Sequence, residues 1–410
     1  MLLYKSRVVN NNNRGVIMDI QKDIKSLKEE LIALRRDFHK HPELGFEEYR
    51  SSEIIANYLR ECGLEVKTRI AKTGVVGLLR GSESGPTILL RADMDALPVK
   101  EENDVEYKSV YEGKSHACGH DGHMAMLLVA AKILSKYKKE IKGNIKFLFQ
   151  PNEEDAGAKF MIEEGVLENP SVDAAHAIHL WTPIKSGDVG ISPGPVMAAH
   201  DNFKIIINGK GGHTSAPQVS IDPIIAAAGI IQSAQSIQSR EINVLKPTSL
   251  MFGKITAGTA PNIIPEQAML EGSIRYLYAG EDSSEEKPRI RLKTMAENVC
   301  NVYRATCNVE FFPSSLAVIN DPTLTEIIKN ETQQVLNVYG GSVVPYVCMA
   351  GEDFSEFGVR VPSVLSFVGA GNEEKETNYP HHHPKFNIDE DVLTIGVEMH
   401  IRSVLRFLSN

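Results

Sequence analysis

Short apolar runs that are typical of β-strands alternate along this chain with longer runs at helical spacing. Residues 19–60 come first and are predicted to form helices broken by a loop at 39–45. The segments that follow are predicted strands at 75–79, 87–91, 144–150 and 173–179, and predicted helices at 122–137 and about 156–164. This alternation predicts an α/β fold in which a mixed sheet lies between helices.

The pattern changes near residue 200. From there to residue 312 it runs strand, helix, two strands, helix, strand, which is the βαββαβ order of a ferredoxin-like α+β layer. The first pattern then resumes and ends in a helix at about 389–407. We therefore expect a catalytic domain formed by residues 19–198 and 313–410, and an inserted lid or dimerisation domain at 199–312. The first 17 residues contain no signal-peptide core, and residues 1–18 are predicted to be a disordered tail. The alternative is an upstream start, with Met18 as the true first residue.

The composition excludes several classes of protein. A chain of 410 residues with 42% hydrophobic residues is long and apolar enough for two globular domains. Its formal net charge of -9 argues against a nucleic-acid partner, and no apolar run reaches the length of a membrane span. The five cysteines are scattered and odd in number, which does not indicate a disulfide framework. We expect a cytoplasmic protein that acts on small molecules.

Residues 116–123 read His-Ala-Cys-Gly-His-Asp-Gly-His and concentrate metal-binding side chains in a short segment. Cys118 and His120 combine a thiol and an imidazole, which suit zinc or a neighbouring first-row metal better than calcium or magnesium. The segment opens a predicted helix, whose amide groups and dipole would favour a thiolate. His116 and His123 stay open between a role in orienting a ligand and a role in capping the helix.

Further candidate side chains follow predicted strands. In α/β sheets, ligands bind beyond the carboxyl ends of the strands. A paired acid there can divide the work, one carboxylate holding a metal while the other accepts a proton from water. We expect Glu154 to be the ligand and Glu153 the base, although the reverse assignment is open at this stage. The candidates lie at Asp93 and Asp95, at Glu153 and Glu154, at His179, and at residues 381–383.

From about residue 35 to the end, the chain resembles the dinuclear metal amidohydrolases that include aminoacylases, hippurate hydrolases, auxin-conjugate hydrolases and related carboxypeptidases. The resemblance is carried, in order, by residues 35–43, 91–98, 118–123, 150–154, 179–181, 211–213, 261–262, 351–355 and the His-Pro-Lys-Phe near residue 385. Departures from the family pattern occur at Ser115, at His176-Ala177 and at His381. None of them removes a candidate ligand.

The resemblance implies a set of roles. Two divalent metal ions (zinc, manganese, cobalt or nickel) would be bound, with Cys118 the first candidate for a bridging ligand. Glu153 would be the general base, and Asp95 would orient a metal ligand. His213, Asn262 and Arg275 of the inserted domain would face the substrate, His213 in the site of a partner subunit if the chain forms a homodimer or a higher homo-oligomer. The implied metal ligands are Cys118, His120, Glu154, His179 and His382, with His383 the alternative to His382.

The predicted activity is hydrolysis of the amide bond of an N-acyl amino acid. One alternative is a carboxypeptidase or dipeptidase that acts on short peptides. Another is a metal-binding protein of the same fold without catalytic activity, which we rank last because neither the base nor a ligand is missing. Several other residues are not expected to take part in the chemistry directly. His176 is expected to pack in the core, and His39, His200 and His400 are expected to have structural roles. Glu352 and Asp353 are expected to have a structural or ligand-orienting role.

Overall fold

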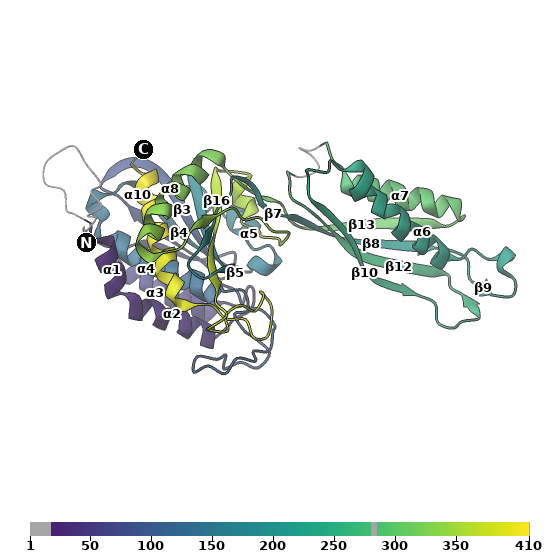
Figure 1. The fold of residues 1–410 in the computed structure, drawn as a ribbon, viewed down its shortest axis with the longest axis horizontal. Coiled ribbons are helices and arrows are strands. Elements are labelled where there is room, and N and C mark those ends of the chain that lie inside the picture. The colour runs from purple at the N-terminus through teal and green to yellow at the C-terminus, as the bar shows by residue number, and fades with distance from the viewer. Residues whose placement is uncertain (1–17, 280–284, 410) are drawn as a thin grey trace. The chain divides into compact units, whose positions relative to one another are not determined.

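The computed structural model describes residues 18–279 and 285–409 (Figure 1). These residues divide into two compact units. The first unit comprises the chain up to Gly194 together with Asn320–Tyr346 and the segment from Asp353 onward, and the second comprises Pro195–Ile319 and Val347–Glu352. The predicted domain boundaries stay a prediction. The predicted tail falls outside the described residues except for Met18, which packs against the core of the first unit.

The first unit is built on a mixed sheet of eight strands in the order β1-β2-β4-β3-β5-β16-β6-β15. Strands β4, β3, β5 and β16 are parallel to their neighbours in the centre, and antiparallel β1 and β2 extend one side. This confirms the predicted mixed α/β architecture. The strands are β1 (Glu65–Ile70), β2 (Gly74–Arg80), β3 (Glu83–Asp93), β4 (Lys142–Gln150), β5 (Ala174–Lys185), β6 (Val189–Gly190), β15 (Val343–Val344) and β16 (Ser363–Gly371).

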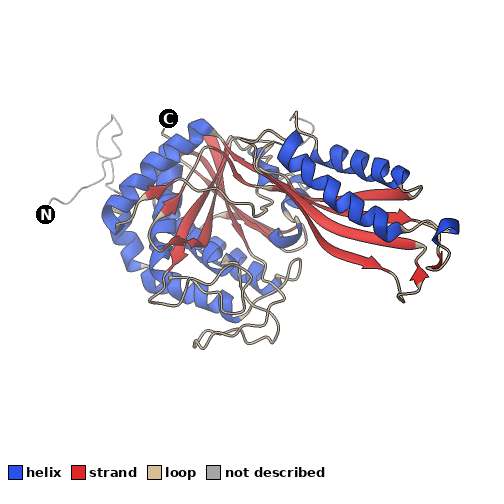
Figure 2. Ribbon diagram, turned by 45° about the vertical axis from the view of Figure 1, so that its right-hand side comes forward, coloured by secondary structure: helices blue, strands red, loops and turns tan. Residues whose placement is uncertain are grey.

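Helices surround this sheet (Figure 2). The last seven residues of β3 and all of β16 are buried without alternation, as expected for strands covered on both faces. Helix α4 packs against α2, α10 and β3 and is buried through most of its length. The helices are α1 (Ile20–Ser26), α2 (Lys28–Lys40), α3 (Tyr49–Glu61), α4 (His120–Lys136), α5 (Ala158–Glu163), α8 (Pro322–Tyr339), α9 (Ser355–Gly358) and α10 (Leu393–Phe407), with short 3-10 turns η1 (Lys138–Glu140), η2 (Glu153–Asp155) and η5 (Glu390–Val392).

The second unit has a four-stranded antiparallel sheet in the order β10-β12-β8-β13 with its own hydrophobic core. Its main elements follow the chain order βαββαβ, and its predicted role as a lid or dimerisation domain stays a prediction. They are β8 (Ala199–Asn208), α6 (Pro223–Ser236), β10 (Thr248–Ala257), β12 (Gln267–Tyr276), α7 (Pro288–Val302) and β13 (Thr306–Ser315), and smaller elements are β7 (Gly194–Met197), β9 (Gly212–His213), η3 (Pro217–Val219), the π-turn η4 (Ile237–Glu241), β11 (Ile263–Ile264) and β14 (Val318–Asn320).

A buried ion-pair network fixes the start of α4 in the first unit. Arg35 Nε lies 2.8 Å from Asp121 Oδ2, and both side chains are fully buried. His39, expected to have only a structural role, donates to Asp121 Oδ2 at 2.7 Å and to Glu101 Oε1 at 3.1 Å. Burial and Arg35 act to lower the pKa of His39, but these two hydrogen bonds outweigh them and raise it. Helices α2 and α4 are thus joined through compensated charges.

A second buried carboxylate holds the loop that follows β4. Glu48 accepts hydrogen bonds from Asn152 N at 2.9 Å and from Thr73 Oγ1 at 2.5 Å. Asn152 has a left-handed backbone (φ 53°), which turns the chain into η2. A Cβ on Gly45 would lie 1.9 Å from Asn152 Oδ1, so glycine allows the 45–48 loop to approach. Desolvation raises the pKa of Glu48 to about 7.

Replacing Arg35 by methionine should lower the free energy of unfolding by about 3–5 kcal/mol, because the change removes the guanidinium from the buried Asp121 carboxylate and leaves His39 as its cationic partner. The measurement is urea denaturation of the metal-free protein. The matched control is Arg80→Met, since Arg80 pairs with Glu65 at a site where the side chains are 50% and 63% exposed. That variant should lose less than about 1 kcal/mol. Equal losses in the two variants would contradict this account of the network.

Replacing Glu48 by glutamine should change how stability depends on pH. The pKa of Glu48 rises from 4.5 to about 7 on folding, so the folded chain holds the extra proton between these values. Wild-type stability therefore falls as pH rises from 4.5 through 7, by at most roughly 3 kcal/mol from this group. Glu48→Gln lacks this loss, so its stability relative to the wild type should increase between pH 5 and pH 8.

The measurement is urea denaturation of both metal-free proteins across that range of pH. Glu47→Gln removes an exposed carboxylate from the same loop and serves as the control. A difference between Glu48→Gln and the wild type that stays constant with pH would contradict the prediction.

Candidate metal centre

The predicted ligands of the first unit come from four places in the chain. Glu153 and Glu154 lie on η2, just after β4 ends at Gln150. His179 lies within β5, while Cys118 and His120 flank the start of α4. Gly119 between them has φ 91°, a left-handed conformation that lets the chain turn into the helix. The 372–389 segment after β16 carries His382.

These side chains converge in three overlapping groups whose ligand atoms lie within 4.8 Å of one another. Because Cys118 belongs to two of the groups, they form one continuous cluster. Two close contacts in the cluster are His382 Nε2 to Glu154 Oε1 at 3.2 Å and Cys118 Sγ to His179 Nε2 at 3.7 Å. The groups are Cys118 with His120 and His179, Cys118 with Glu154 and His382, and His120 with Glu153 and Glu154.

Hydrogen bonds to backbone carbonyls fix the tautomers of two histidines. His120 Nδ1 donates to Asp95 O at 2.8 Å, and His179 Nδ1 donates to Leu180 O at 2.8 Å. A carbonyl only accepts, so Nδ1 of each ring carries a proton and Nε2 is the nitrogen that is left for the cluster. Within the described residues, His120 Nε2 is buried and has no hydrogen-bond partner. A soft-to-borderline divalent cation fits this donor set of thiol, imidazoles and carboxylates.

The cluster carries an excess of negative charge. Burial acts to lower the pKa of His120, but the carboxylates of Asp93 and Asp95 outweigh it and raise the pKa to about 10. Burial, followed by Glu154 and Glu153, raises the pKa of the Cys118 thiol well above its usual range. The expectation that the helix start favours a thiolate is therefore wrong for the protein without a cation, because desolvation and neighbouring carboxylates dominate. A bound cation would reverse that balance.

The three consecutive histidines have different surroundings. His382, with φ 65°, is the one placed beside Glu154 and Cys118. His381 stacks on Trp181 with ring centroids 4.2 Å apart and lies within hydrogen-bond distance of Leu180 O at 3.1 Å. His383 stacks on Tyr379 at 4.8 Å. The backbone alternates the three rings among different neighbours, so their spacing in the sequence could not have separated them.

Two aspartates at the end of β3 and just after it, Asp93 and Asp95, contact the cluster. Asp95 accepts a hydrogen bond from Glu154 N at 3.1 Å through its carboxylate, in addition to its carbonyl contact with His120. The sequence did not decide whether Asp93 is a turn residue or part of the site. Its carboxylate is fully buried between Arg91 Nη1 at 2.6 Å and His123 Nδ1 at 2.6 Å. Arg91 also donates to Asp353 Oδ1 at 3.0 Å. Sequence reasoning missed the pairing of Arg91 with Asp353, because nothing in the spacing of these distant residues indicates it.

The predicted substrate-binding residues all lie in the second unit. His213 on β9 is exposed, and Ile263 of β11 pairs with it. Asn262 accepts a backbone hydrogen bond from Thr214 N at 3.2 Å through its carbonyl oxygen. His213 and Asn262 line the same cavity of about 610 Å³. Arg275 lies apart on β12 and donates to Met349 O at 2.9 Å.

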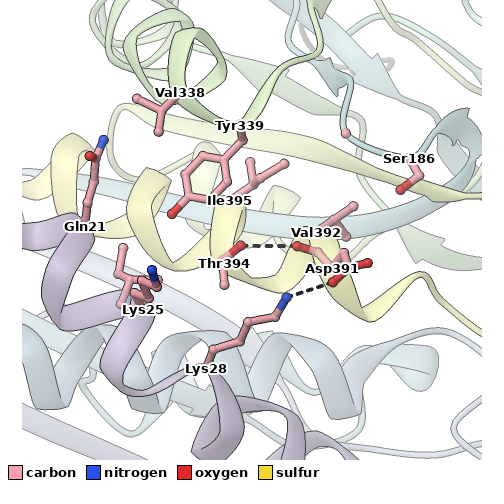
Figure 3. Close-up of a pocket in the computed structure, with 12 residues that line it drawn as sticks. Gln21, Lys25, Lys28, Ser186, Val338, Tyr339, Asp391, Val392, Thr394 and Ile395 are labelled. Carbon is pink, nitrogen blue, oxygen red and sulfur yellow. Dashed lines mark hydrogen bonds and ion pairs between the residues drawn. The ribbon is translucent and has the colours of Figure 1, made fainter. Parts of the chain in front are cut away.

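A separate cavity of about 520 Å³ lies in the first unit between α1, α8 and α10 (Figure 3). Its charged lining includes the ion pair of Lys28 with Asp391 at 2.8 Å. None of its lining residues belongs to the cluster around Cys118. Within the described ranges, the protein contains no helix with both the length and the apolar character needed to cross a bilayer.

Comparison with known proteins identifies the family. The chain is 39% identical over 397 residues to thermostable carboxypeptidase 2 of Saccharolobus solfataricus, covering 96% of this chain and 99% of that protein. It is 36% identical over 374 residues to N-acetylcysteine deacetylase of Bacillus subtilis, covering 91% and 95%. The crystal structure of the Bacillus subtilis YXEP protein, described as a dinuclear metal binding peptidase from the M20 family, superposes with a TM-score of 0.79 at 32% identity, covering 94% and 99%. Residues 89–406 match peptidase family M20/M25/M40, and the chain belongs to that family.

Proposed function

We propose that this protein is a metal-dependent amidohydrolase that cleaves the amide bond of N-acyl amino acids. The convergence of Cys118, His120, Glu154, His179 and His382 in overlapping groups of three is the observation that carries the proposal. Membership of the M20/M25/M40 family makes the protein a metal-dependent hydrolase of carbon–nitrogen bonds. The relative that is an N-acetylcysteine deacetylase supports the narrower choice of an acylated amino acid.

Two divalent cations, drawn from zinc, manganese, cobalt or nickel, are proposed to be held by those five side chains, with Cys118 shared between them. One group of three contains His120 and His179 and another contains Glu154 and His382, and Cys118 is the member common to these two groups, which supports a shared position. When bound, such cations would polarise the amide carbonyl and acidify a water molecule. Asp95 is proposed to keep His120 in the tautomer whose Nε2 is free, because its carbonyl accepts the Nδ1 proton.

Glu153 is proposed to be the general base. One of its oxygens lies 3.9 Å from His120 Nε2, beside the ligands but outside the pairing of Glu154 with His382. Its carboxylate would take a proton from the attacking water and deliver it to the amide nitrogen, so that the amine leaves as a neutral group. General-base assistance of this kind contributes about 10²–10⁴-fold to the rate.

The substrate is proposed to contact His213, Asn262 and Arg275. The Arg275 guanidinium uses Nη1 for Met349 O, and its fork geometry suits the free carboxylate of an N-acyl amino acid. His213 Nδ1 accepts from Ser215 N at 3.1 Å, which leaves Nε2–H as a donor for an oxyanion. The homodimer in which His213 would serve a partner subunit and the cytoplasmic location are part of the same proposal, and light scattering on the purified protein tests the dimer.

A second candidate function is a carboxypeptidase that acts on short peptides. The identity of 39% to a thermostable carboxypeptidase over almost the whole chain favours it. Both reactions cleave an amide next to an amino acid with a free carboxylate, so they share the metal centre and the base. They differ in what the pocket accepts on the acyl side.

Replacing Glu153 by glutamine should lower kcat by about 10²–10⁴-fold, because the glutamine side chain cannot accept the proton of the attacking water. The amount of bound metal should stay at the wild-type level. Metal content is measured by inductively coupled plasma mass spectrometry beside a steady-state hydrolysis assay. Asp155→Asn, an exposed neutralisation on the same 3-10 turn, is the control and should keep wild-type kcat. Loss of metal from Glu153→Gln, or full activity in it, would reject Glu153 as the base.

A substrate panel should separate the two candidate reactions. The apoprotein is loaded in turn with zinc, manganese, cobalt and nickel, and kcat/KM is measured for N-acetyl amino acids, N-benzoyl amino acids and dipeptides. The proposed function predicts the highest values for the acylated amino acids with at least one metal. Preference for dipeptides would move the assignment to the second candidate. Stable metal binding with no hydrolysis of any compound would leave a protein of this fold without amidase activity.

A further inference from the structure

The main-chain peptide of Leu180, directly after the candidate ligand His179, is held from both sides by imidazoles. Its carbonyl accepts from His179 Nδ1 at 2.8 Å and lies 3.1 Å from His381 Nε2. Its N–H donates to His123 Nε2 at 2.8 Å. A bond from the backbone of a strand to a buried side chain needs an explanation, because strands normally satisfy their amides with neighbouring strands.

The explanation lies in where β3 ends. The pairing of β3 with β5 runs from Ile88 opposite Ala174 to Arg91 opposite Ala177. The chain leaves the sheet after Asp93, so Leu180 lies beyond this pairing. His123, one turn into α4 and 1% exposed, supplies the acceptor instead. An imidazole thus extends the hydrogen bonding of the sheet at the position next to a candidate ligand.

The partner of the other ring nitrogen of His123, Nδ1, fixes which nitrogen carries the proton. His123 Nδ1 lies 2.6 Å from Asp93 Oδ1, and the second oxygen of Asp93 accepts from Arg91 Nη1 at 2.6 Å. Because a carboxylate accepts and an N–H donates, Nδ1 carries the proton and Nε2 carries the lone pair. Arg91, Asp93, His123 and the Leu180 peptide form a chain of hydrogen bonds from β3 to β5.

These hydrogen bonds decide whether His123 can be a metal ligand, which its spacing in the sequence leaves open. Asp93, His120 and His123 are close enough to form a metal-binding group of their own. However, both nitrogens of His123 are engaged, one as a donor and one as an acceptor, so no lone pair remains for a cation. His120, by contrast, has an unpartnered Nε2 within the described residues. His123 lies beside the ligands, with its ring centroid 4.6 Å from that of His179, without being one.

We propose that His123, held by Asp93, is a positioning residue that fixes the Leu180 peptide and thereby aims His179 Nε2 at the metal centre. The inference rests on the proposed function for the identity of that centre. Without the acceptor, the Leu180 N–H would be buried and unpaired, and the end of β5 would shift to find another partner. His179 Nε2, 3.7 Å from Cys118 Sγ, would move with it.

Two substitutions separate the two contacts of His123. The side-chain amide nitrogen of asparagine occupies the place of Nδ1, so His123→Asn keeps a donor for Asp93 but offers no acceptor to Leu180 N. The amide oxygen of glutamine occupies the place of Nε2, so His123→Gln keeps the acceptor and loses the contact with Asp93. His176→Asn is the control, because His176 is also a buried histidine, lies on β5 and contacts Ser366 Oγ at 3.1 Å.

The experiment titrates each metal-free protein with cobalt(II) and follows the d–d and thiolate charge-transfer absorption, with thermal unfolding of the metal-free proteins in parallel. Of the two cobalt ions, we expect His123→Asn to bind the more weakly held one about 10–100-fold less tightly than the wild type does. The absorption spectrum of its cobalt complex should also differ from that of the wild type. His123→Gln should restore both to near wild-type values even where its unfolding temperature is lower. His176→Asn should keep the wild-type spectrum and affinity.

Several outcomes would overturn the inference. Wild-type affinity in His123→Asn is one of them. A second is loss of affinity in all three variants in proportion to their loss of stability, which would indicate a purely structural role. Failure of His123→Gln to restore affinity is a third. A wild-type protein that binds no cobalt would instead reject the proposed function, and the titration distinguishes this case because it does not depend on hydrolysis.

Discussion

The site depends on one electrostatic constraint: carboxylates and a thiol are gathered at a buried edge of the sheet in excess of the positive charge around them. The pKa of His120 rises to about 10 and that of Cys118 rises above its usual range for this same reason. Like charges that are withdrawn from water repel strongly because screening is weak. A bound divalent cation would offset this repulsion, and the donor set suits such a cation.

Elsewhere in the first unit, buried arginines compensate the charges of buried carboxylates. Arg35 balances Asp121 directly after His120, and Arg91 balances Asp93 and Asp353. Each guanidinium joins segments that are far apart in the sequence, so the charges also set the relative positions of the loops.

The sequence was sufficient for the order of strands and helices, for the mixed sheet, and for the segments that contribute side chains to the cluster. Parallel strands end at one edge, so polar residues after successive strands must meet there. Features that depend on side-chain environment were beyond its reach. The protonation of Cys118 depends on burial that no local pattern reports. The resemblance of Pro384-Lys385-Phe386 to the family pattern already favoured His382 as the ligand, but the different neighbours of His381 and His383 come from the fold. The support of Asn152 by Glu48 joins residues more than a hundred positions apart.

His120 and His123 illustrate why spacing alone does not identify a ligand. Residues three apart on a helix lie on one face, so both imidazoles reach the same region. Each ring has one donor and one acceptor nitrogen, and the partner of one nitrogen decides what the other can do. His120 donates a hydrogen bond from Nδ1 to a backbone carbonyl, so its Nε2 is the nitrogen that faces the cluster. His123 donates a hydrogen bond from Nδ1 to Asp93 and accepts one from a peptide N–H at Nε2, so neither nitrogen is left to bind a metal ion. The division between binding a metal and orienting a ligand is therefore made by the backbone groups beside each ring.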